Sequence, residues 1–597
     1  MYSGTKLIDA LIKQHEKRSN SGLFKSGEFT LDWRSKVGSF PHPDGETIVS
    51  AGEPCGSWQT AIITKGKGSD KTQSESKPEA KRNIDDNINS SFKKISFDSS
   101  KVIEAEKKAI DCQNKSNEMG YKQLPVNGYV PAASIRGIVR AWVSQYPQLV
   151  DEMRRLLGWQ NDSEITAGKI EFLDAFPTKP TKLTLDVTNP QQDFQVFHTG
   201  SAKPLSLYTL GDGREKIEIK VAIRGCRGAK TEDVATVWEW VQQALSTHGI
   251  GSRTASGYGT LKAPDSYIPS VELPKLKEGY TSKTLNFTLY SQGCGGINSK
   301  VCDELRPTHW RGWLRSWVLR FLLGVMSRDH AELTANELFG SLNQKGLVRL
   351  QVGIHKPALS QGRPIVYRWT GSLELSAPDY ILNEIMLPII KIAVRVSGVG
   401  KGWRRPLHIV SGWSRGCHVE LTQSRADVVN NSTPSKLDLA GNDLNLIYDV
   451  WKDAVIKKWH DRYQENTPSI EAEVFSPASC AVYRVPGTAQ NPIDIKTLKW
   501  IDKEPQGTRG KGMELIYEDR YKRQPEVGGN IKDRDHRNSN CSWVSIKRVN
   551  GSQSNPQCQE IVCIFMGSEN EFGLRSQFLA DLAKIPDAVH LFGKQPN

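Results

Sequence analysis

The sequence predicts an α+β protein built from two related domains in tandem. Its 597 residues exceed what one hydrophobic core holds, because single cores stop growing at about 250–300 residues. Three short sequence boxes occur twice in the same order, which indicates a duplicated domain. Both copies of the second box read as a helix ended by glycine and followed by an alternating strand, so helices and strands are expected in each half.

Composition favours a soluble protein with a polyanionic partner. The hydrophobic fraction is 38 % and the mean hydropathy is -0.48. No run of about 18 apolar residues occurs and the start lacks a signal-peptide pattern, so we expect no membrane partner and a cytoplasmic location. The net charge of +13 favours phosphate-rich ligands. None of the 10 cysteines has C-x-x-C spacing, so a zinc ribbon or redox motif is not supported.

The first box has the pattern R-G-x-[VL]-R-x-W. It spans residues 134–142 and 309–317, and its matched positions are Arg136, Gly137, Arg140 and Trp142 in one copy and Arg311, Gly312, Arg315 and Trp317 in the other. A proline lies just upstream of each copy and an apolar helical pattern follows, which predicts a helix start. Basic residues are unfavourable near that end of a helix, so the box suggests a bound anion. The alternative is a solvated basic helix face.

The second box spans 156–158 with 168–172, and 337–341 with 346–350; we expect it to be structural. The third box follows an apolar helical stretch in both halves. Its chemistry-bearing residues are Gly249, Gly251, Arg253, Thr254 and Tyr258 in one copy and Gly398, Gly400, Lys401, Trp403, Arg404 and Arg405 in the other. Closely spaced glycines let a backbone approach a phosphate, and the basic and aromatic residues add charge and stacking surface. The alternative for a lone G-x-G is a tight turn.

These boxes resemble the RAMP superfamily, the ferredoxin-like subunits that hold guide RNA in CRISPR effector complexes. VPAASIRGIVRAW (130–142) and GIGSRTASGYGTLK (249–262) match the family's helix start and late glycine-rich loop. Residues 174–190 make the first half similar to the sixth subunit of the Cmr-type module. Residues 293–317 and 337–341 make the second half similar to its first subunit. Ala133 and Thr308 stand where one family serine is usual, and His309 replaces the other.

The resemblance implies two ferredoxin-like (RRM-like) β-α-β-β-α-β domains with insertions. It also implies a crRNA-binding role in a type III effector complex, with target RNA, RAMP neighbours and the large signalling subunit as partners. The guide backbone would lie over the helix starts and glycine loops. The residues expected to contact RNA are Ser134, Arg136, Gly137, Arg140, Gly249, Gly251, Arg253, Thr254, Tyr258, His309, Arg311, Gly312, Arg315, Gly398, Gly400, Lys401, Trp403, Arg404 and Arg405.

The predicted layout runs as follows. The first domain begins in 1–63, is interrupted by a flexible insertion at 64–122 and resumes at 123–263. A proline- and lysine-containing linker covers 264–284. The second domain has its core at 285–414, an insertion or thumb-like region at 415–540 and closing strands at 541–597.

Catalysis is an open alternative at this point. Some subunits of the resembled family cut target RNA with an aspartate after the first strand and a divalent metal. Asp303, as catalytic residue and metal ligand, and Asp32 are the candidates, with Asp44 in the corresponding region; Mg²⁺ suits such a site. His42, His309 and His536 are candidates for metal-independent acid–base chemistry. We favour binding over cutting and expect no structural cofactor. A scaffold whose basic loops bind acidic protein surfaces is the further alternative.

Overall fold

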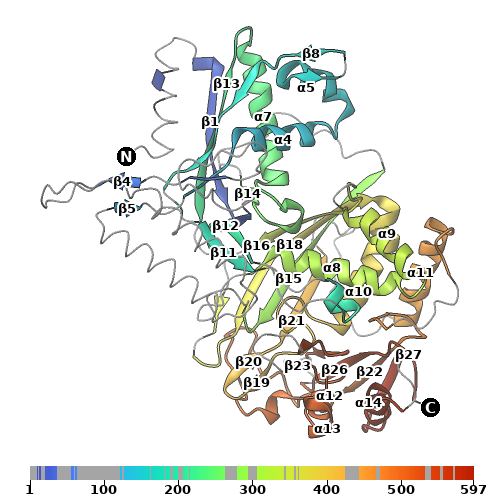
Figure 1. Cartoon of the computed structure of the whole chain (residues 1–597). Helices are drawn as coiled ribbons and strands as arrows, with labels where there is room; N and C mark the ends of the chain where they lie inside the picture. The colour runs from blue at the N-terminus through green and yellow to red at the C-terminus, as the bar shows by residue number, and fades with distance from the viewer. Residues whose placement is uncertain are drawn as a thin grey trace, which may run out of the picture. The chain divides into compact units, whose positions relative to one another are not determined.

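The computed structural model divides the chain into two units. The first comprises Met1–Thr188 and Leu205–Glu278, and the second comprises Asn189–Pro204 and Gly279–Asn597 (Figure 1). The structure describes residues 10, 13–14, 21–36, 56–58, 61–63, 121–123, 127–161, 163–179, 181, 183–187, 192–199, 206–213, 216–262, 279–293, 305–341, 344–354, 358–360, 362–423, 443–464, 471–531, 539–551, 556–568 and 572–596.

The main sheet of the first unit has the order β10-β13-β1-β14, with β9 also paired to β13, and every pair is antiparallel. Its elements in chain order are β1 (Phe24–Leu31), α4 (Ala132–Val143), α5 (Val150–Leu157), β9 (Ile170–Phe172), β10 (Phe176–Pro177), β13 (Ile217–Gly225), α7 (Thr231–His248) and β14 (Leu261–Lys262). The chain therefore runs strand, helices, strand, strand, helix, strand.

One face of this sheet carries the core of the first unit. Ile219 and Val221 on β13 are buried, and they share a cluster with Ile135 of α4 and Val237 of α7. Helix α7 begins where the Lys230 amide donates to Asp233 Oδ2 at 2.9 Å, and it ends at Gly249 with φ 73°. Smaller pieces complete the unit: η1 (Ser21–Leu23), β2 (Ser35–Lys36), β3 (Gly56–Trp58), β4 (Ala61–Ile63), β5 (Tyr121–Gln123), β6 (Asn127–Tyr129), η2 (Pro147–Leu149), β7 (Trp159–Gln160), β8 (Ile165–Thr166), β11 (Leu183–Val187), β12 (Ser206–Leu210) and η3 (Thr254–Ser256).

The second unit repeats this order. Its first sheet has the order β16-β18-β15-β21, all antiparallel, with β17 also on β18. The elements are β15 (Tyr280–Ser291), α8 (Pro307–Leu322), α9 (Arg328–Phe339), β16 (Arg349–Ile354), β17 (Ala358–Leu359), β18 (Tyr367–Pro378), the π-helical η4 (Ile381–Met386), α10 (Leu387–Val396) and β21 (Cys417–Gln423). On β18 alternate residues are buried, as expected for a strand with one face on a core.

The C-terminal part of the second unit forms a third copy of this order. The strands β22 (Cys480–Pro486), β25 (Val544–Val549), β26 (Gln559–Phe565) and β27 (Val589–Gly593) form an antiparallel sheet in the order β25-β26-β22-β27. Helices α12 (Lys511–Ile516) and α13 (Asp519–Lys522) precede β25, and α14 (Leu574–Ala583) precedes β27 (Figure 1, orange to red). We call the three copies the first, second and third repeats.

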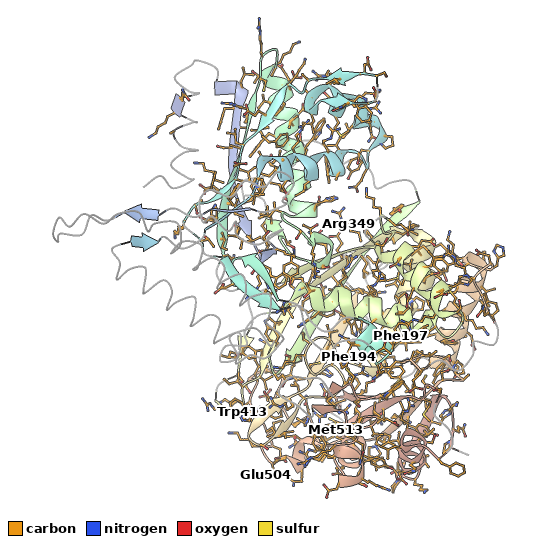
Figure 2. All side chains as sticks on the ribbon, in the orientation of Figure 1. Phe194, Phe197, Arg349, Trp413, Glu504 and Met513 are labelled. Atoms are coloured by element: carbon orange, nitrogen blue, oxygen red, sulfur yellow. The ribbon has the colours of Figure 1, made fainter. Side chains whose placement is uncertain are left out.

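The third repeat is buried on both faces of its sheet. Val482 and Phe565 join the core that α8 and α10 build, whereas Tyr483 and Ile564 join a separate cluster with Met513 of α12 and helix α14 (Figure 2). The remaining elements are α6 (Gln192–Val196), β19 (His408–Val410), β20 (Trp413–Arg415), α11 (Leu444–Lys458), η6 (Gln506–Thr508), β23 (Asn530–Ile531) and β24 (Ser539–Asn540).

The α+β prediction is confirmed, but the layout after residue 415 differs from the expected one. β21, inside the expected insertion 415–540, is the fourth strand of the second repeat. Of the expected closing strands within 541–597, β25 pairs with β26 and β26 pairs with β22, so they belong to the sheet of the third repeat. The third repeat keeps Arg509-Gly510 before its first helix, but α12 has only 6 residues and shows no box-one pattern. Of the insertion 64–122, residues 64–120 lie outside the described part, as do residues 263–278 of the linker region, and β15 already begins at Tyr280.

The segment 189–204 belongs to the second unit although β11 and β12, which flank it, belong to the first. Phe194 lies on α6 and is buried, and Phe197 after it joins the same core as α8 (Figure 2). The Arg328 guanidinium lies 3.8 Å from the Phe197 ring centroid. We call residues 189–204 the arm. Among the described helices, none is both long and apolar enough to cross a lipid bilayer.

Candidate nucleic-acid interface

The box-one arginines of the first repeat bind the carboxyl end of the next helix. Arg136 Nη2 donates to the Leu157 carbonyl, and Arg140 Nη1 donates to the Gly158 carbonyl at 2.6 Å. The last carbonyls of a helix lack intrahelical partners and carry the negative end of its dipole, so a cation there is stabilising. Burial and the nearby Arg136 lower the pKa of Arg140. Arg136 nevertheless stays exposed at the surface of α4.

The second repeat makes the same contacts with matched residues. Arg311 Nη2 donates to the Phe339 carbonyl at 2.5 Å, and Arg315 donates to the Ala335 carbonyl at 3.1 Å and to Asn336 Oδ1 at 2.7 Å. Burial lowers the pKa of Arg311 to about 10. The two boxes therefore share a structural role: each ties the first helix of its repeat to the end of the following one. Phosphate contact by these four arginines stays a prediction.

An internal carboxylate occupies the helix start in two of the three repeats. The Ala132 amide donates to Asp174 Oδ1 at 2.7 Å in the first repeat. In the third, the amides of Gly510 and Met513 donate to Glu560 at 3.0 and 2.9 Å. Burial raises the pKa of Glu560. At these two helix starts the protein itself supplies the acceptor, and a bound anion at the box-one helix starts stays a prediction.

His309 stands at the helix start of the second repeat and is buried. Burial, with Arg306 and Lys401 nearby, lowers its pKa to about 3, so the imidazole is neutral at physiological pH. Gly400 covers the ring with φ 80°, and a Cβ there would lie 2.9 Å from His309 Nδ1. In this conformation the His309 ring packs against Gly400 and supports the second glycine loop.

The first glycine loop, residues 249–259, is packed tightly against its own chain. The Ile250 amide donates to the Gly259 carbonyl at 2.8 Å, and the Gly259 amide donates to the Arg34 carbonyl at 2.7 Å. Gly251 has φ 81°, and a Cβ there would lie 2.4 Å from Ser35 Oγ. The glycines of this loop are therefore required by the packing of the loop itself. Arg253, which follows, is exposed and has φ 58°.

Tyr258 has a structural role in place of the expected stacking one. Its ring is 1 % exposed and lies 4.6 Å from the Trp33 ring, and its hydroxyl donates to Asp186 Oδ2 at 2.7 Å. A base has no access to either face of this ring. The sequence placed Tyr258 beside two glycines, but it carried no signal that Trp33, 225 positions earlier, would cover it.

In the second glycine loop, residues 398–405, the aromatic side chain lies against protein cations. The Arg404 guanidinium lies 4.2 Å and the Arg320 guanidinium 5.2 Å from the Trp403 ring centroid. Trp403 is partly buried against the large core of the second unit. Base stacking by Trp403 stays a prediction, and the exposed part of the ring is the surface available for it.

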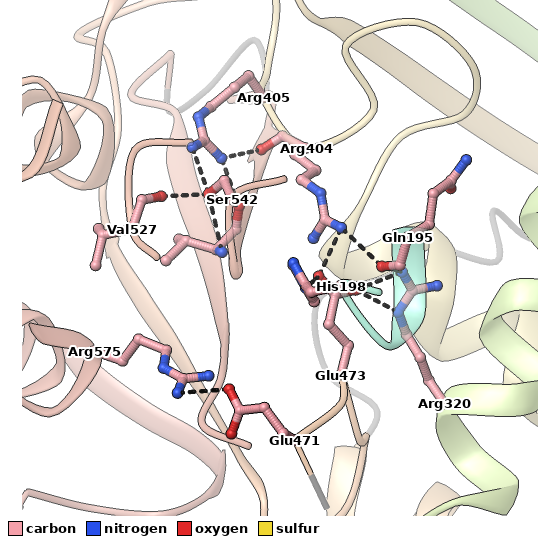
Figure 3. Close-up of polar contacts among 11 residues, drawn as sticks. Gln195, His198, Arg320, Arg404, Arg405, Glu471, Glu473, Val527, Ser542 and Arg575 are labelled. Carbon is pink, nitrogen blue, oxygen red and sulfur yellow. Dashed lines mark hydrogen bonds and ion pairs between the residues drawn. The ribbon is translucent and has the colours of Figure 1, made fainter. Parts of the chain in front are cut away.

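Arg404 belongs to a buried ionic cluster around Glu473 (Figure 3). The Glu473 carboxylate lies 2.6 Å from Arg404 Nη2, 2.5 Å from Arg320 Nη2 and 3.0 Å from His198 Nε2 of the arm. Gln195 of the arm accepts from both arginines through its carbonyl. Although burial opposes ionisation, Arg404 and Arg320 hold the pKa of Glu473 at about 2.

Arg405 connects the second loop to the third repeat. Its guanidinium donates to the Val544 carbonyl at 2.6 Å and to Ser542 Oγ at 2.8 Å (Figure 3). Burial lowers its pKa to about 10. Arg404 and Arg405 therefore hold protein together in this conformation, which differs from the expected phosphate contacts.

Five of the expected RNA contacts are exposed. Arg253 and Lys401 lie one on each glycine loop, Gly137 and Gly312 lie on the outer faces of α4 and α8, and Arg136 lies beside Gly137. Thr254, beside Arg253, is half-buried. Ser134 lies in the first turn of α4, and its amide donates to the Pro131 carbonyl at 3.0 Å.

The catalytic candidates do not assemble into a site in the described part of the chain. Asp32 pairs with Lys262 at 3.2 Å, and burial raises the pKa of its carboxyl. Asp303, with His42, Asp44 and His536, lies outside the described residues. Among the described side chains, no group of three or more His, Cys, Asp or Glu is placed to hold a metal ion. The magnesium site stays a prediction.

Sequence reasoning missed two features of this region. Glu473 precedes β22 in the run Glu471-Ala472-Glu473, and nothing in this run distinguishes Glu473 as a buried ionic centre. Trp413 lies just beyond the third box, at the tip of the β19–β20 hairpin, and is 61 % exposed. The Ser411-Gly412 dipeptide before it is a turn signal that would have revealed the hairpin.

The comparisons with known proteins do not identify the class of this chain. No protein-family model matches it, and no curated protein does. Among solved structures, it is similar to the crystal structure of Cmr6 from Pyrococcus furiosus, with 16 % identity over 40 % of this chain and 97 % of that one. The TM-score is 0.18, so this likeness carries no argument about fold or function.

Proposed function

We propose that this chain is a crRNA-binding subunit of a type III CRISPR effector complex. It would hold the guide backbone, and the guide–target duplex, along the helix starts and glycine loops of its first two repeats. Target RNA, neighbouring RAMP subunits and the large signalling subunit would be its partners. The RAMP-like boxes support this, and so does the β-α-β-β-α-β order in all three repeats, which is that of ferredoxin-like domains.

One observation carries the proposal: two helix glycines that no contact among the described residues explains. Gly137 and Gly312 are each the sixth residue of their helix, beside Arg136 and Arg311. A Cβ at either position would meet no described atom within 4 Å. Glycine inside a helix costs about 1 kcal/mol relative to alanine, so the chain loses stability twice at equivalent places. A ligand backbone that approaches these helices closely would account for both.

The glycine loops add charge to this surface. Arg253 follows Gly251 and Lys401 follows Gly400, and both side chains are exposed. In the second repeat the loop lies beside the helix start, because Gly400 covers His309. In the first repeat His248, which precedes the loop, lies 3.0 Å from Gln145 at the other end of α4. An RNA backbone passing along the helix and the loop would meet a bare helix surface and one cation in each repeat. Such contacts bind without reading sequence, which suits a subunit whose specificity comes from base pairing in the guide.

The first test is to purify the chain with the proteins it assembles with and to sequence the bound RNA. A discrete short RNA carrying CRISPR repeat sequence is the expected result. Gly137→Ala and Gly312→Ala then test whether these two glycines mark a close contact with RNA. Each is expected to stabilise its unit by about 1 kcal/mol, yet to weaken RNA binding about tenfold, because the added methyl holds the ligand backbone off the helix.

Ala141→Gly is the matched control, because Ala141 is exposed on α4 one turn beyond Gly137. It lowers helix stability without adding atoms, so RNA affinity should not change. Higher stability with unchanged RNA affinity in both glycine variants would show that RNA does not contact the helices at these glycines. Purification without RNA, or with random RNA, would favour the scaffold alternative instead.

A further inference from the structure

The β19–β20 hairpin of the second repeat is buried on one side and exposed on the other. Val410 pairs with Trp413 across a two-residue turn, in which Ser411 has φ 49° and Gly412 has φ 74°. Two left-handed residues are the requirement of the type I′ turn, whose twist matches that of its strands. The tip is therefore held in one shape, and the side chain that it presents is Trp413 (Figure 2).

Trp413 and Arg415 lie on the same face of the hairpin. Both are exposed, whereas Ser414 between them is buried and donates to the Ile365 carbonyl. Side chains two apart on a strand share a face and are roughly 6–7 Å apart. An indole ring and a guanidinium thus stand side by side in solvent, with the opposite face of the hairpin packed on the protein. Among the described exposed large apolar side chains, Trp413 is the one tryptophan.

The hairpin shares its base with the second glycine loop. The Cys417 amide donates to the Arg405 carbonyl at 3.0 Å. Gly416 between them has φ 82°, and a Cβ there would lie 2.2 Å from the Pro406 carbonyl oxygen, so only glycine fits. Arg415 Nη1 lies 3.4 Å from Gln292 Oε1. A Cβ on Gly402 would lie 2.9 Å from Gln292 Nε2, so loop and hairpin pack on the same side chain.

We propose that this hairpin binds one unpaired nucleotide of the RNA, with the base stacked on Trp413 and the phosphate on Arg415. The inference rests on the proposed function and goes beyond it by adding a base contact outside the helix starts and glycine loops. Stacking on an aromatic side chain needs a base that is not covered by a pairing partner or a neighbour, so the ligand is single-stranded at this point. A stack of this kind is indifferent to base identity, which suits any guide.

A protein partner is the competing occupant of this surface. Ile365 is 39 % exposed beside the hairpin, and apolar patches mark protein contacts. The position of Arg415 on the same face of the hairpin as Trp413, and of the exposed Lys401 on the adjoining loop, favours an anionic ligand over an apolar one. The two occupants give opposite results in the experiment below.

The experiment measures binding of a short single-stranded RNA to the full chain, with Trp413→Ala, Trp413→Phe and Arg415→Ala. Trp413→Ala should weaken binding about tenfold or more, and Trp413→Phe should retain most of it. Arg415→Ala should reduce the salt slope of log Kd by about one. In an RNA series lacking one base at a time, one position should weaken the wild type but leave Trp413→Ala unaffected.

Phe572→Ala is the matched control, since Phe572 is 86 % exposed in the third repeat and should not affect RNA binding. Unchanged affinity in Trp413→Ala, while Arg253→Ala and Lys401→Ala weaken binding, would overturn the hairpin site and leave the proposed function standing. Absence of RNA binding by the wild type would overturn both. Intact RNA binding with lost subunit assembly in Trp413→Ala would assign the hairpin to a protein partner.

Discussion

The two glycine loops begin alike and end differently. In each, a residue that is 1 % exposed, Ile250 or Val399, separates two glycines, and an exposed cation follows. The first loop contacts the β1–β2 segment of its own repeat through Arg34 and Lys36. The second loop continues into two arginines whose guanidiniums are engaged by the arm, by Glu473 and by the third repeat.

The third repeat explains this difference. Strand β25 runs against the second loop and its flanks: the Ile546 amide donates to the Arg404 carbonyl at 2.9 Å, and Ser545 Oγ donates to the Val396 carbonyl at 2.8 Å. Arg548 reaches the Leu407 carbonyl at 2.7 Å. The same motif thus presents one cation to solvent in both repeats, and in the second repeat its two further arginines hold neighbouring segments of the chain. Basic residues in a motif become ligand contacts only where no domain packs on them.

The largest expected effect comes from Glu473→Ala. The substitution leaves Arg320 and Arg404 buried without their counter-ion, which should destabilise the second unit by about 3–5 kcal/mol. Thermal unfolding should show the loss, and hydrogen exchange should place it in the arm, α8 and the second loop. Glu471→Ala, two residues away, is the control: Glu471 is 55 % exposed and pairs with Arg575 at 3.2 Å, so its loss should cost about 1 kcal/mol or less.

The same carboxylate predicts a pH dependence. Its pKa is lowered from 4.5 to about 2 in the folded protein, so its contribution is complete above pH 4.5 and is lost as the pH falls toward 2. Glu473→Gln should remove most of the acid sensitivity of the second unit in this window. If wild type and Glu473→Gln lost stability in parallel between these pH values, the cluster would not be the source.

Arg405→Ala and Arg253→Ala should give opposite phenotypes, which is the direct test of the comparison between the loops. Arg405→Ala removes hydrogen bonds to buried acceptors and should cost about 2–4 kcal/mol of stability. Arg253→Ala removes an exposed cation and should leave stability within about 0.5 kcal/mol while weakening RNA binding and lowering its salt slope by about one.

Arg227→Ala is the matched control for Arg253→Ala. Arg227 is an exposed arginine just before α7, and Arg253 lies just after it, so the helix of 18 residues sets the two about 27 Å apart. An equal loss of RNA affinity in both variants would indicate nonspecific charge attraction and not a specific RNA contact by the first glycine loop. Stability loss in Arg253→Ala equal to that in Arg405→Ala would remove the distinction between the loops.

The fold was predictable as far as local patterns repeat. Pro131 and Pro307, the R-G-x-[VL]-R spacing and the late glycines marked the helices and loops of two repeats, because those signals lie within a few residues of each other. The third repeat escaped detection because β22 and β26 are buried on both faces and show no alternation, and because its first helix is short. Its sheet is defined by pairings between strands about 80 residues apart, such as Cys480 with Phe565.

The sequence singled out the arginines of this region but not the acceptor that each of them binds. The sequence indicated that Arg136, Arg311 and the loop arginines matter, and it offered a bound anion as the reason. The structure places most of these guanidiniums on carbonyls and a carboxylate of the chain itself, such as Glu473. Which acceptor a buried arginine finds depends on segments far away in sequence, and no local pattern records that choice.

The smallest expected effect concerns a substitution in the first glycine loop alone. Arg253 has φ 58° and ψ 31°, a left-handed conformation that costs a non-glycine residue about 1–2 kcal/mol. Arg253→Gly removes this cost but makes the unfolded chain more flexible, so a net gain of about 0.5–1 kcal/mol is expected, together with weaker RNA binding. Chemical denaturation measures the first effect and RNA titration the second. Arg227→Gly, at a position without positive φ, should lose stability instead. A gain in stability with undiminished RNA affinity would mean that the left-handed backbone serves the loop's packing and not the display of Arg253 to a ligand.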